Sequence, residues 1–298
     1  MEEKIFYEKK IQELEDEIRN LKEQLDLKNK QLQEYAKDLK KTYKEKKQSL
    51  EEKIRFESEL EIAASIQKKL LPFNIPDIPG VDMSFISLPA RHVGGDYLGI
   101  YTDEKSQLSI GIGDVMGKGI PAALLMTTIR AVWRSIVINH FVLPAVVLET
   151  INSSTYEDFS YNDMFMSLFH ATYDLRNKLI YYSNAAHNPP LYLNSDSNEI
   201  QELDTEGSLI GFELKTNFIG TARQLNVNDL ILFYTDGVIE IQNKEKKQFG
   251  VENLKKIILE YKSLSTKELL DIILDKIYKF EDNTTQNDDL TIFILKIK

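Results

Sequence analysis

Apolar residues in the first 70 positions recur at the spacing of a coiled-coil seam, and neither glycine nor proline interrupts them. The seam consists of Ile11, Leu14, Ile18, Leu21, Leu25, Leu32, Tyr35 and Leu39. It is imperfect, because Lys28 occupies one seam position and the register shifts after Leu39. A long helix cannot bury such a stripe alone, so the pattern favours a parallel dimeric coiled coil. A single solvated, charged helix is the alternative.

The pattern changes at Pro72, which we expect to end the helix. Short β-branched and aromatic runs then alternate with Gly, Asn and Asp turns, which is typical of strands. We predict strands at Val81–Pro89, Tyr97–Thr102, Leu108–Gly113, Met166–Asp174, Leu179–Ser183, Leu191–Leu193, Ile200–Leu203, Asp229–Thr235 and Leu290–Ile297. We predict helices at 119–137, 144–152, 250–261 and 266–280. This order lacks a regular βαβ alternation and indicates an α+β fold of layered sheets with flanking helices.

These patterns divide the chain into three parts. Residues 1–58 form the predicted coiled-coil, dimerisation and regulatory helix, residues 59–75 a linker helix, and residues 76–298 the predicted catalytic domain. No apolar run of about 18 residues appears, so no membrane-spanning helix is expected. The N-terminus lacks the apolar core of a signal peptide, so we expect a soluble cytoplasmic protein.

Composition restricts the chemistry that the domain can perform. The net charge of −10 disfavours a nucleic-acid partner, because binding to phosphates needs a basic face. The chain has no cysteine and only four histidines, which excludes disulfides and thiolate metal sites. Any metal site must therefore rely on oxygen ligands, which favours hard cations such as Mg²⁺ or Mn²⁺.

Aspartates stand at the ends of four predicted strands. Asp96 follows two glycines, Asp114 closes one strand, Asp236 closes another, and Asp288 with Asp289 precedes the last. Each one alone is compatible with an ordinary turn or a solvated loop. If they converge, their mutual repulsion raises their pKa values unless a cation compensates, so a converging cluster indicates a metal site.

Six motifs in order resemble the PPM-type serine/threonine phosphatases of the SpoIIE/RsbU class. They are "PARHVGGDY", "IGDVMGKGIPAAL", "NAAHNPPLYL", "LFYTDGVIE", "FG" and "NDDLTIFIL", and the preceding "AASIQKKLLP" also resembles the helix before that domain. The resemblance covers about residues 60–298, and it does not include the predicted coiled coil. It implies a β-sandwich flanked by helices, with two Mn²⁺ or Mg²⁺ ions at one end of the sheets.

The resemblance also assigns roles to individual residues. It implies that Asp114 bridges the two ions and that the Val115 carbonyl is a further ligand. Asp236 and Asp288 would complete one metal site, and Asp96 would hold the other metal directly or through water. A water acidified by both cations would attack the phosphoryl group. The implied substrate is a phosphorylated anti-anti-sigma (STAS-domain) protein in a partner-switching pathway.

This chain departs from the family pattern at three places. Leu98-Gly99 stands where a second acidic residue is often found, Ala186 replaces a turn glycine, and Met116 stands where animal relatives have a histidine. Two functions of other classes therefore stay open, a non-catalytic scaffold that signals through its coiled coil and a hydrolase of small phosphoesters. Loss of the acidic residue is expected to weaken a metal site.

Several other residues have two interpretations. Lys118 could attract phosphate or be solvated, and Arg91 could contact phosphate. His187 is expected to shape its loop rather than to catalyse, His92 to lie on the surface, and Trp133 to lie in the core. We also expect the helix at 59–71 to pack near the first and second aspartate motifs. A change in coiled-coil register would then act on the metal site, and the input would be a protein partner at residues 1–60.

Overall fold

The computed structural model describes residues 1–71, 75–103, 107–138, 141–282, 286 and 288–298. Pro72, the predicted end of the first helix, lies outside these residues. The chain divides into two units, Met1–Glu59 and Leu60–Lys298. Helix α1 (Glu2–Leu70) supplies all of the first unit and the first residues of the second.

The first unit is a continuous helix with no buried residue. The seam side chains are about half exposed or more, with values from 49% for Leu14 to 69% for Tyr35. Surface ion pairs at helical spacing, such as Lys47–Glu51 and Lys53–Glu57, link its polar positions. Each such pair stabilises a helix by only about 0.3–0.5 kcal/mol, so burial of the seam is the larger force available to this segment.

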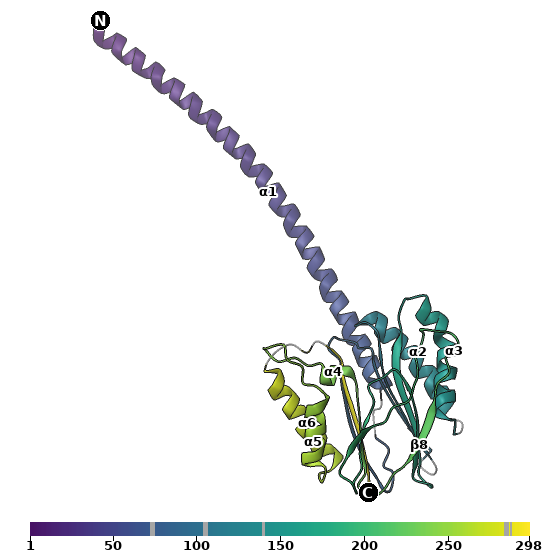
Figure 1. The fold of residues 1–298 in the computed structure, drawn as a ribbon. Helices are drawn as coiled ribbons and strands as arrows, with labels where there is room; N and C mark the ends of the chain where they lie inside the picture. The colour runs from purple at the N-terminus through teal and green to yellow at the C-terminus, as the bar shows by residue number, and fades with distance from the viewer. Residues whose placement is uncertain (72–74, 104–106, 139–140, 283–285, 287) are drawn as a thin grey trace. The chain divides into compact units, whose positions relative to one another are not determined.

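The second unit contains two antiparallel five-stranded sheets (Figure 1). One sheet has the order β1-β10-β9-β6-β7, formed by Val81–Leu88, Leu290–Ile297, Leu230–Tyr234, Leu191–Leu193 and Ile200–Glu202. The other has the order β2-β3-β4-β5-β8, formed by Asp96–Thr102, Gln107–Val115, Met166–Asp174, Leu179–Ala185 and Gly220–Gln224. The predicted α+β fold is therefore confirmed.

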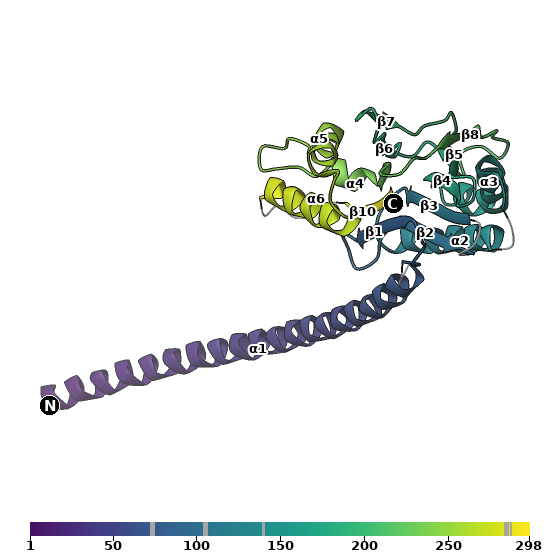
Figure 2. The same ribbon diagram turned by 90° about the horizontal axis from the view of Figure 1, so that it is seen from below.

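Helices cover the outer face of each sheet (Figure 2). The helices of the second unit after α1 are α2 (Ile120–Val137), α3 (Pro144–Ser160), α4 (Asp236–Ile239), α5 (Val251–Tyr261) and α6 (Thr266–Glu281). One apolar cluster lies between the sheets, a second packs α2 and α3 onto the β2–β3–β4–β5 sheet, and a third packs α5 and α6 onto the other sheet. The central strands are buried on both faces, which explains near-continuous apolar runs such as "LILFY" in β9.

Helix α2 is the one helix among the described residues that is long and apolar enough to span a membrane. The absence of a membrane-spanning helix stays a prediction, and α2 contains Arg130 and Arg134, so it is not an uninterrupted apolar run. Its residues Ala122, Met126, Ile129 and Trp133 are buried in the cluster that includes Tyr97 of β2 and Val115 of β3. This is the environment of a core helix.

Two elements were not predicted from the sequence. Strand β8 has the polar sequence "GTARQ" and is largely exposed, because it lies at a sheet edge and has no buried face to impose alternation. Helix α4 is a single turn directly after β9. Helix α3 also extends eight residues beyond the predicted end at 152, because Thr155 and Phe159 continue its buried face.

Candidate metal centre

The hairpin of β2 and β3 places two of the predicted aspartates opposite each other. Asp96 is the first residue of β2 and Asp114 is the penultimate residue of β3, and the antiparallel register pairs them directly. Directly paired residues in antiparallel strands have Cβ atoms about 4.5–5.5 Å apart. The repeated Gly-Asp pattern therefore serves one site from two adjacent strands.

Gly95 lets the Val115 carbonyl and the Asp114 carboxylate approach this hairpin end. A Cβ atom at Gly95 would lie 2.8 Å from the Val115 carbonyl oxygen and 3.2 Å from Asp114 Oδ1. Real Cβ atoms do not lie 2.8 Å from a backbone oxygen, so any side chain at position 95 would displace the Val115 carbonyl. The two predicted oxygen ligands thus face the same small space beside Gly95.

Asp96 is held by two threonines that sequence reasoning did not identify. Its Oδ2 accepts hydrogen bonds from Thr235 Oγ1 at 2.8 Å and from Thr291 Oγ1 at 2.6 Å. Its Oδ1 is buried and has no hydrogen-bond partner within the described part of the chain. Thr235 directly precedes Asp236, and Thr291 follows Asp288 and Asp289 at the start of β10. A threonine beside each of these two aspartate motifs was the signal in the sequence that could have identified them.

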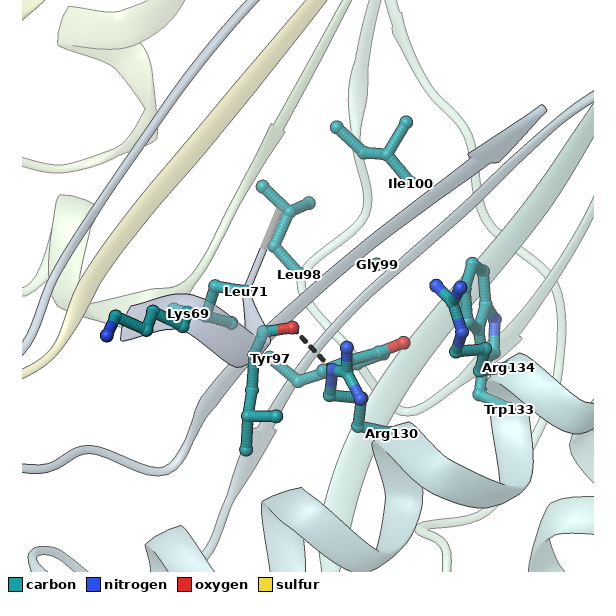
Figure 3. A pocket seen from close by; sticks show the side chains of 10 residues that line it. Lys69, Leu71, Tyr97, Leu98, Gly99, Ile100, Arg130, Trp133 and Arg134 are labelled. Atoms are coloured by element: carbon teal, nitrogen blue, oxygen red, sulfur yellow. Dashed lines mark hydrogen bonds between the residues drawn. The ribbon is translucent and has the colours of Figure 1, made fainter. Parts of the chain in front are cut away.

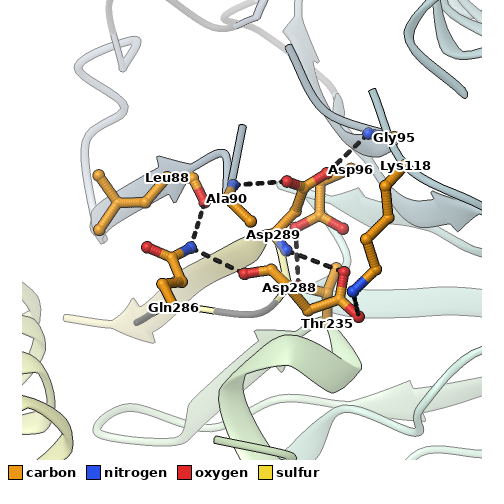
Figure 4. A network of polar contacts seen from close by, with 9 residues as sticks. All are labelled: Leu88, Ala90, Gly95, Asp96, Lys118, Thr235, Gln286, Asp288 and Asp289. Carbon is orange, nitrogen blue, oxygen red and sulfur yellow. Dashed lines mark hydrogen bonds and ion pairs between the residues drawn. The ribbon is translucent and has the colours of Figure 1, made fainter. Parts of the chain in front are cut away.

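The adjacent aspartates 288 and 289 have different partners (Figure 4). Asp289 accepts from the backbone N–H groups of Ala90 and Gly95, each at 2.7 Å, so it fixes the loop before β2. Asp288 instead forms an ion pair with Lys118, with 2.7 Å between Oδ2 and Nζ. Asp288 Oδ1 also accepts from the Asp289 N–H at 3.0 Å, so the two residues differ in that Asp289 holds backbone groups of another loop whereas Asp288 pairs with a side-chain cation.

Burial and mutual repulsion raise the pKa values of the clustered carboxyls. Burial raises the pKa of Asp96 well above its usual value of 3.8, and the charge of Asp114 raises it further. Burial, followed by the charges of Asp236 and Asp288, raises the pKa of Asp114 to about 8. Burial and then the Asp288 charge also raise the pKa of Asp236. The four predicted aspartates therefore act on one another electrostatically.

The donor set fits a hard divalent cation. Carboxylate and carbonyl oxygens are the ligands of Mg²⁺ and Mn²⁺, and a cation removes the repulsion that raises these pKa values. The unpartnered, buried Oδ1 of Asp96 is an acceptor of the kind that a cation satisfies. As they stand, no three acidic or histidine side chains among the described residues are grouped closely enough to hold one ion. Lys118 supplies part of the opposing charge instead, since it lowers the pKa of both Asp114 and Asp236.

The last residues of α1 contact the first aspartate motif within the second unit. Gln67 Nε2 donates to the Gly94 carbonyl at 2.8 Å, and the Gly94 N–H donates to Gln67 Oε1 at 3.0 Å. This paired contact agrees with the expected packing of the 59–71 helix near the motif. The side chain of Gln67 thus lies one residue from the Gly95 position where the metal-ligand candidates meet.

The remaining candidate residues lie outside the carboxylate cluster or have structural contacts. His187 is buried, its Nδ1 bonds with Ser167 Oγ at 2.8 Å, and burial lowers the pKa of His187 to about 4. His92 and Arg91 are exposed, and Trp133 is 2% exposed in the core. Ala186 has φ of 54°, a left-handed conformation that favours the glycine implied by the family resemblance.

Comparison with known proteins agrees with the fold and the motif order. Residues 104–298 match the family described as Stage II sporulation protein E (SpoIIE). The chain belongs to the SpoIIE family. Among relatives in this class, phosphoserine phosphatase RsbU of Bacillus subtilis (strain 168) is 31% identical over 242 residues, which cover 81% of this chain and 71% of that protein. Two other curated relatives are spanned over only 40% and 47% of their length.

Solved structures show that the SpoIIE-family domain has the PP2C-type fold. The SiaA-PP2C domain of Pseudomonas aeruginosa superposes with a TM-score of 0.73 at 20% identity, over 83% of this chain and 98% of that one. RsbX, crystallised in complex with magnesium, superposes with a TM-score of 0.57 at 15% identity, over 76% of this chain and 99% of that one. The predicted β-sandwich flanked by helices is thereby confirmed.

Proposed function

We propose that this chain is a metal-dependent phosphatase that hydrolyses phosphoserine or phosphothreonine in a protein. The observation that carries the proposal is the cluster of Asp96, Asp114, Asp236 and Asp288, whose mutual repulsion calls for a cation. Membership of the SpoIIE family and the likeness to phosphoserine phosphatase RsbU support the same activity.

The proposed ligands are the oxygens that the fold brings to the end of the β2–β3 hairpin. Asp114, the Val115 carbonyl, Asp236 and Asp288 would hold two ions of Mg²⁺ or Mn²⁺, with Asp96 contributing to one of them. When bound, such ions lower the pKa of water to make a nucleophile and neutralise phosphate oxygens. Thr235 and Thr291 orient the Asp96 carboxylate, so its Oδ1 keeps a fixed direction.

Two other residues bear on how the phosphate is held and on which group protonates the departing oxygen. Lys118 forms an ion pair with Asp288. If a metal ion took the place of the Lys118 ammonium beside Asp288, the flexible side chain could contact a phosphate oxygen instead. His187 is neutral at pH 7 because its pKa is lowered to about 4, so it cannot donate a proton as an imidazolium. The departing serine oxygen would take its proton from solvent.

The proposed substrate is a phosphorylated anti-anti-sigma-like (STAS-domain) protein in the cytoplasm. Family resemblance supports this choice, and dephosphorylation would let that protein bind its anti-sigma partner. Small phosphoesters such as p-nitrophenyl phosphate should be hydrolysed slowly, because they lack the protein surface that would hold the phosphoserine. A panel of phosphopeptides, nucleotides and a phosphorylated STAS protein separates this proposal from a hydrolase of small phosphoesters.

The decisive experiment measures phosphate release with the full chain. With Mn²⁺ or Mg²⁺, the protein should release phosphate from a phosphoserine protein, and chelation should stop it. Asp114→Asn should abolish release, whereas Asp271→Asn, an equal change at an exposed α6 carboxylate, should retain it. If Asp114→Asn and the unmodified chain behave identically, the phosphatase proposal fails and a phosphoprotein-binding scaffold takes its place.

The first unit is proposed to dimerise the chain and regulate the domain. Its exposed apolar seam supports a second copy as partner, and Gln67 supports a link to the Gly94 loop. Leu21→Lys, on the seam, should shift the full chain from dimer to monomer in light scattering. Asn20→Lys, one position off the seam, should leave the dimer intact. A monomeric unmodified chain would refute dimerisation.

A further inference from the structure

A basic cavity lies along β2, which is an edge strand of its sheet. Its volume is about 270 Å³, and it is bounded by the last residues of α1, by β2 and by α2 (Figure 3). Asp96 and Tyr97 are neighbours in β2, so their side chains point to opposite faces of the sheet. Residues from both faces of β2 line the basic cavity, but none of the clustered aspartates does.

Three cationic side chains line the basic cavity. Lys69 comes from α1, and Arg130 and Arg134 come from α2. The two arginines are four residues apart on one helix, so they share a face, and like charges in this arrangement destabilise a helix by about 0.2–0.5 kcal/mol. Across the described ranges, none of the three forms an ion pair with a carboxylate, although the chain has a net charge of −10.

A buried hydroxyl faces the same space. Tyr97 is only 1% exposed, and its hydroxyl has no hydrogen-bond partner among the residues with defined positions. In Figure 3 this hydroxyl points toward Arg130 and Arg134, and their charges act on it electrostatically. Buried hydroxyl groups almost always have a partner, so an acceptor that enters the cavity would complete this one.

The position of Arg130 leaves donors available to a ligand. Its Nε donates to the Leu70 carbonyl at the end of α1 (Figure 3). A guanidinium group has five N–H donors in a planar fork, so this bond uses one of them. Arg130 is thus oriented by the backbone of α1, and Arg134 lies one helical turn further along the cavity wall.

We propose that the basic cavity binds a phosphate group, in the form of a small free dianion such as inorganic phosphate. The arginine forks match phosphate oxygens, and the Tyr97 hydroxyl can donate to a further oxygen. Drug-sized ligands occupy cavities of roughly 300–1,000 Å³, so this volume favours a small ion over a nucleotide. The anion would join Lys69 of α1 to the arginines of α2. The proposal does not depend on the phosphatase activity.

The test is a phosphate titration of the full chain with metals chelated, so that phosphate cannot bind through a cation. Binding is measured by calorimetry, with sodium chloride at matched ionic strength as the reference. The unmodified chain should bind inorganic phosphate at millimolar concentration. Arg134→Gln should weaken binding about tenfold or more, because a charge-assisted hydrogen bond is lost. Arg134→Lys should weaken it less.

The matched control is Arg176→Gln, an equal charge change at an exposed turn between β4 and β5. It should bind phosphate like the unmodified chain. Equal binding by Arg134→Gln and Arg176→Gln, or no preference of the unmodified chain for phosphate over chloride, would overturn the proposal. A phosphoserine peptide forms a separate arm. If the peptide binds through Arg134 and inorganic phosphate does not, the assignment to a small free ion is wrong.

Discussion

Substitution of Asp114 by asparagine should stabilise the metal-free protein at neutral pH. Asp114 is buried beside Asp236 and Asp288, and together these effects raise its pKa to about 8. In the unfolded chain the same carboxyl returns to its usual value of 3.8. Between these two values the folded state binds a proton that the unfolded state releases, so stability falls as pH rises.

The size of the effect follows from the two pKa values. Each pH unit in this interval changes the free energy of unfolding by about 1.4 kcal/mol. From 3.8 to pH 7 the interval is about 3.2 units, which gives a ceiling of about 4 kcal/mol for the loss at pH 7. Asparagine has nearly the shape of the protonated acid and does not ionise, so Asp114→Asn should recover most of this loss.

Urea unfolding of the full chain in a chelating buffer measures the difference. At pH 4 the free energies of unfolding of Asp114→Asn and the unmodified chain should differ by less than about 1 kcal/mol. The variant should become more stable by roughly 2–4 kcal/mol as pH approaches 7, and the gap should stop growing above about pH 8. Added Mg²⁺ or Mn²⁺ should stabilise the unmodified chain and have little effect on the variant.

The control is Asp271→Asn, because this exposed carboxylate on α6 pairs with Lys267 far from the cluster. Its difference from the unmodified chain should stay within about 0.5 kcal/mol at every pH, as for most surface substitutions. A gap between Asp114→Asn and the unmodified chain that does not change with pH would refute the electrostatic argument.

Three further predictions concern the same domain. Metal binding requires Asp114 to lose its proton, so the metal affinity measured by calorimetry should rise about tenfold per pH unit below about pH 8; a pH-independent affinity contradicts this. Gln67→Ala removes two hydrogen bonds to Gly94, so it should lower stability by roughly 1–3 kcal/mol and speed hydrogen exchange at the Gly94 amide; unchanged exchange would show that the contact does not hold the loop. Ala186→Gly relieves a left-handed backbone and should raise stability by up to about 1 kcal/mol in urea unfolding, whereas Ala185→Gly in β5 should lower it.

Much of the fold followed from the sequence because its strands are buried on both faces. The predicted start at Val81 and the predicted range Met166–Asp174 match β1 and β4 at those points. Apolar content was a reliable signal for these central strands. It failed for β8, which is exposed and polar, since the backbone pairing with β5 holds it in the sheet without a buried side-chain pattern.

The candidate site was predictable in part, for a reason of topology. Asp96 and Asp114 lie on consecutive antiparallel strands, so local register brings them together. Asp236 and Asp288 come from the other sheet, and only the order of family motifs indicated that they would join. The contacts of Thr235 and Asp289 depend on how the two sheets meet, which no local pattern encodes.

The missing acidic residue at Leu98-Gly99 has a further consequence at position 99. That its loss weakens a metal site stays a prediction, and Leu98 is buried in the core between the sheets. Gly99 shares the face of Tyr97, and a Cβ atom there would overlap the Tyr97 hydroxyl oxygen. Position 99 therefore lines the basic cavity rather than the carboxylate cluster.

A carboxylate at position 99 would approach the two arginines instead of the candidate metal centre. It would neutralise Arg130 and Arg134, which at present have no acidic partner among the described residues. Glycine at this position leaves the arginines unneutralised and gives room for the Tyr97 hydroxyl, which a Cβ atom there would overlap, and for the Trp133 ring, which would lie 2.9 Å from that atom. The departure from the family pattern at Gly99 thus permits the close packing of Tyr97 and Trp133 at the wall of the basic cavity. The candidate metal centre, none of whose four predicted aspartates lines this cavity, is a separate site.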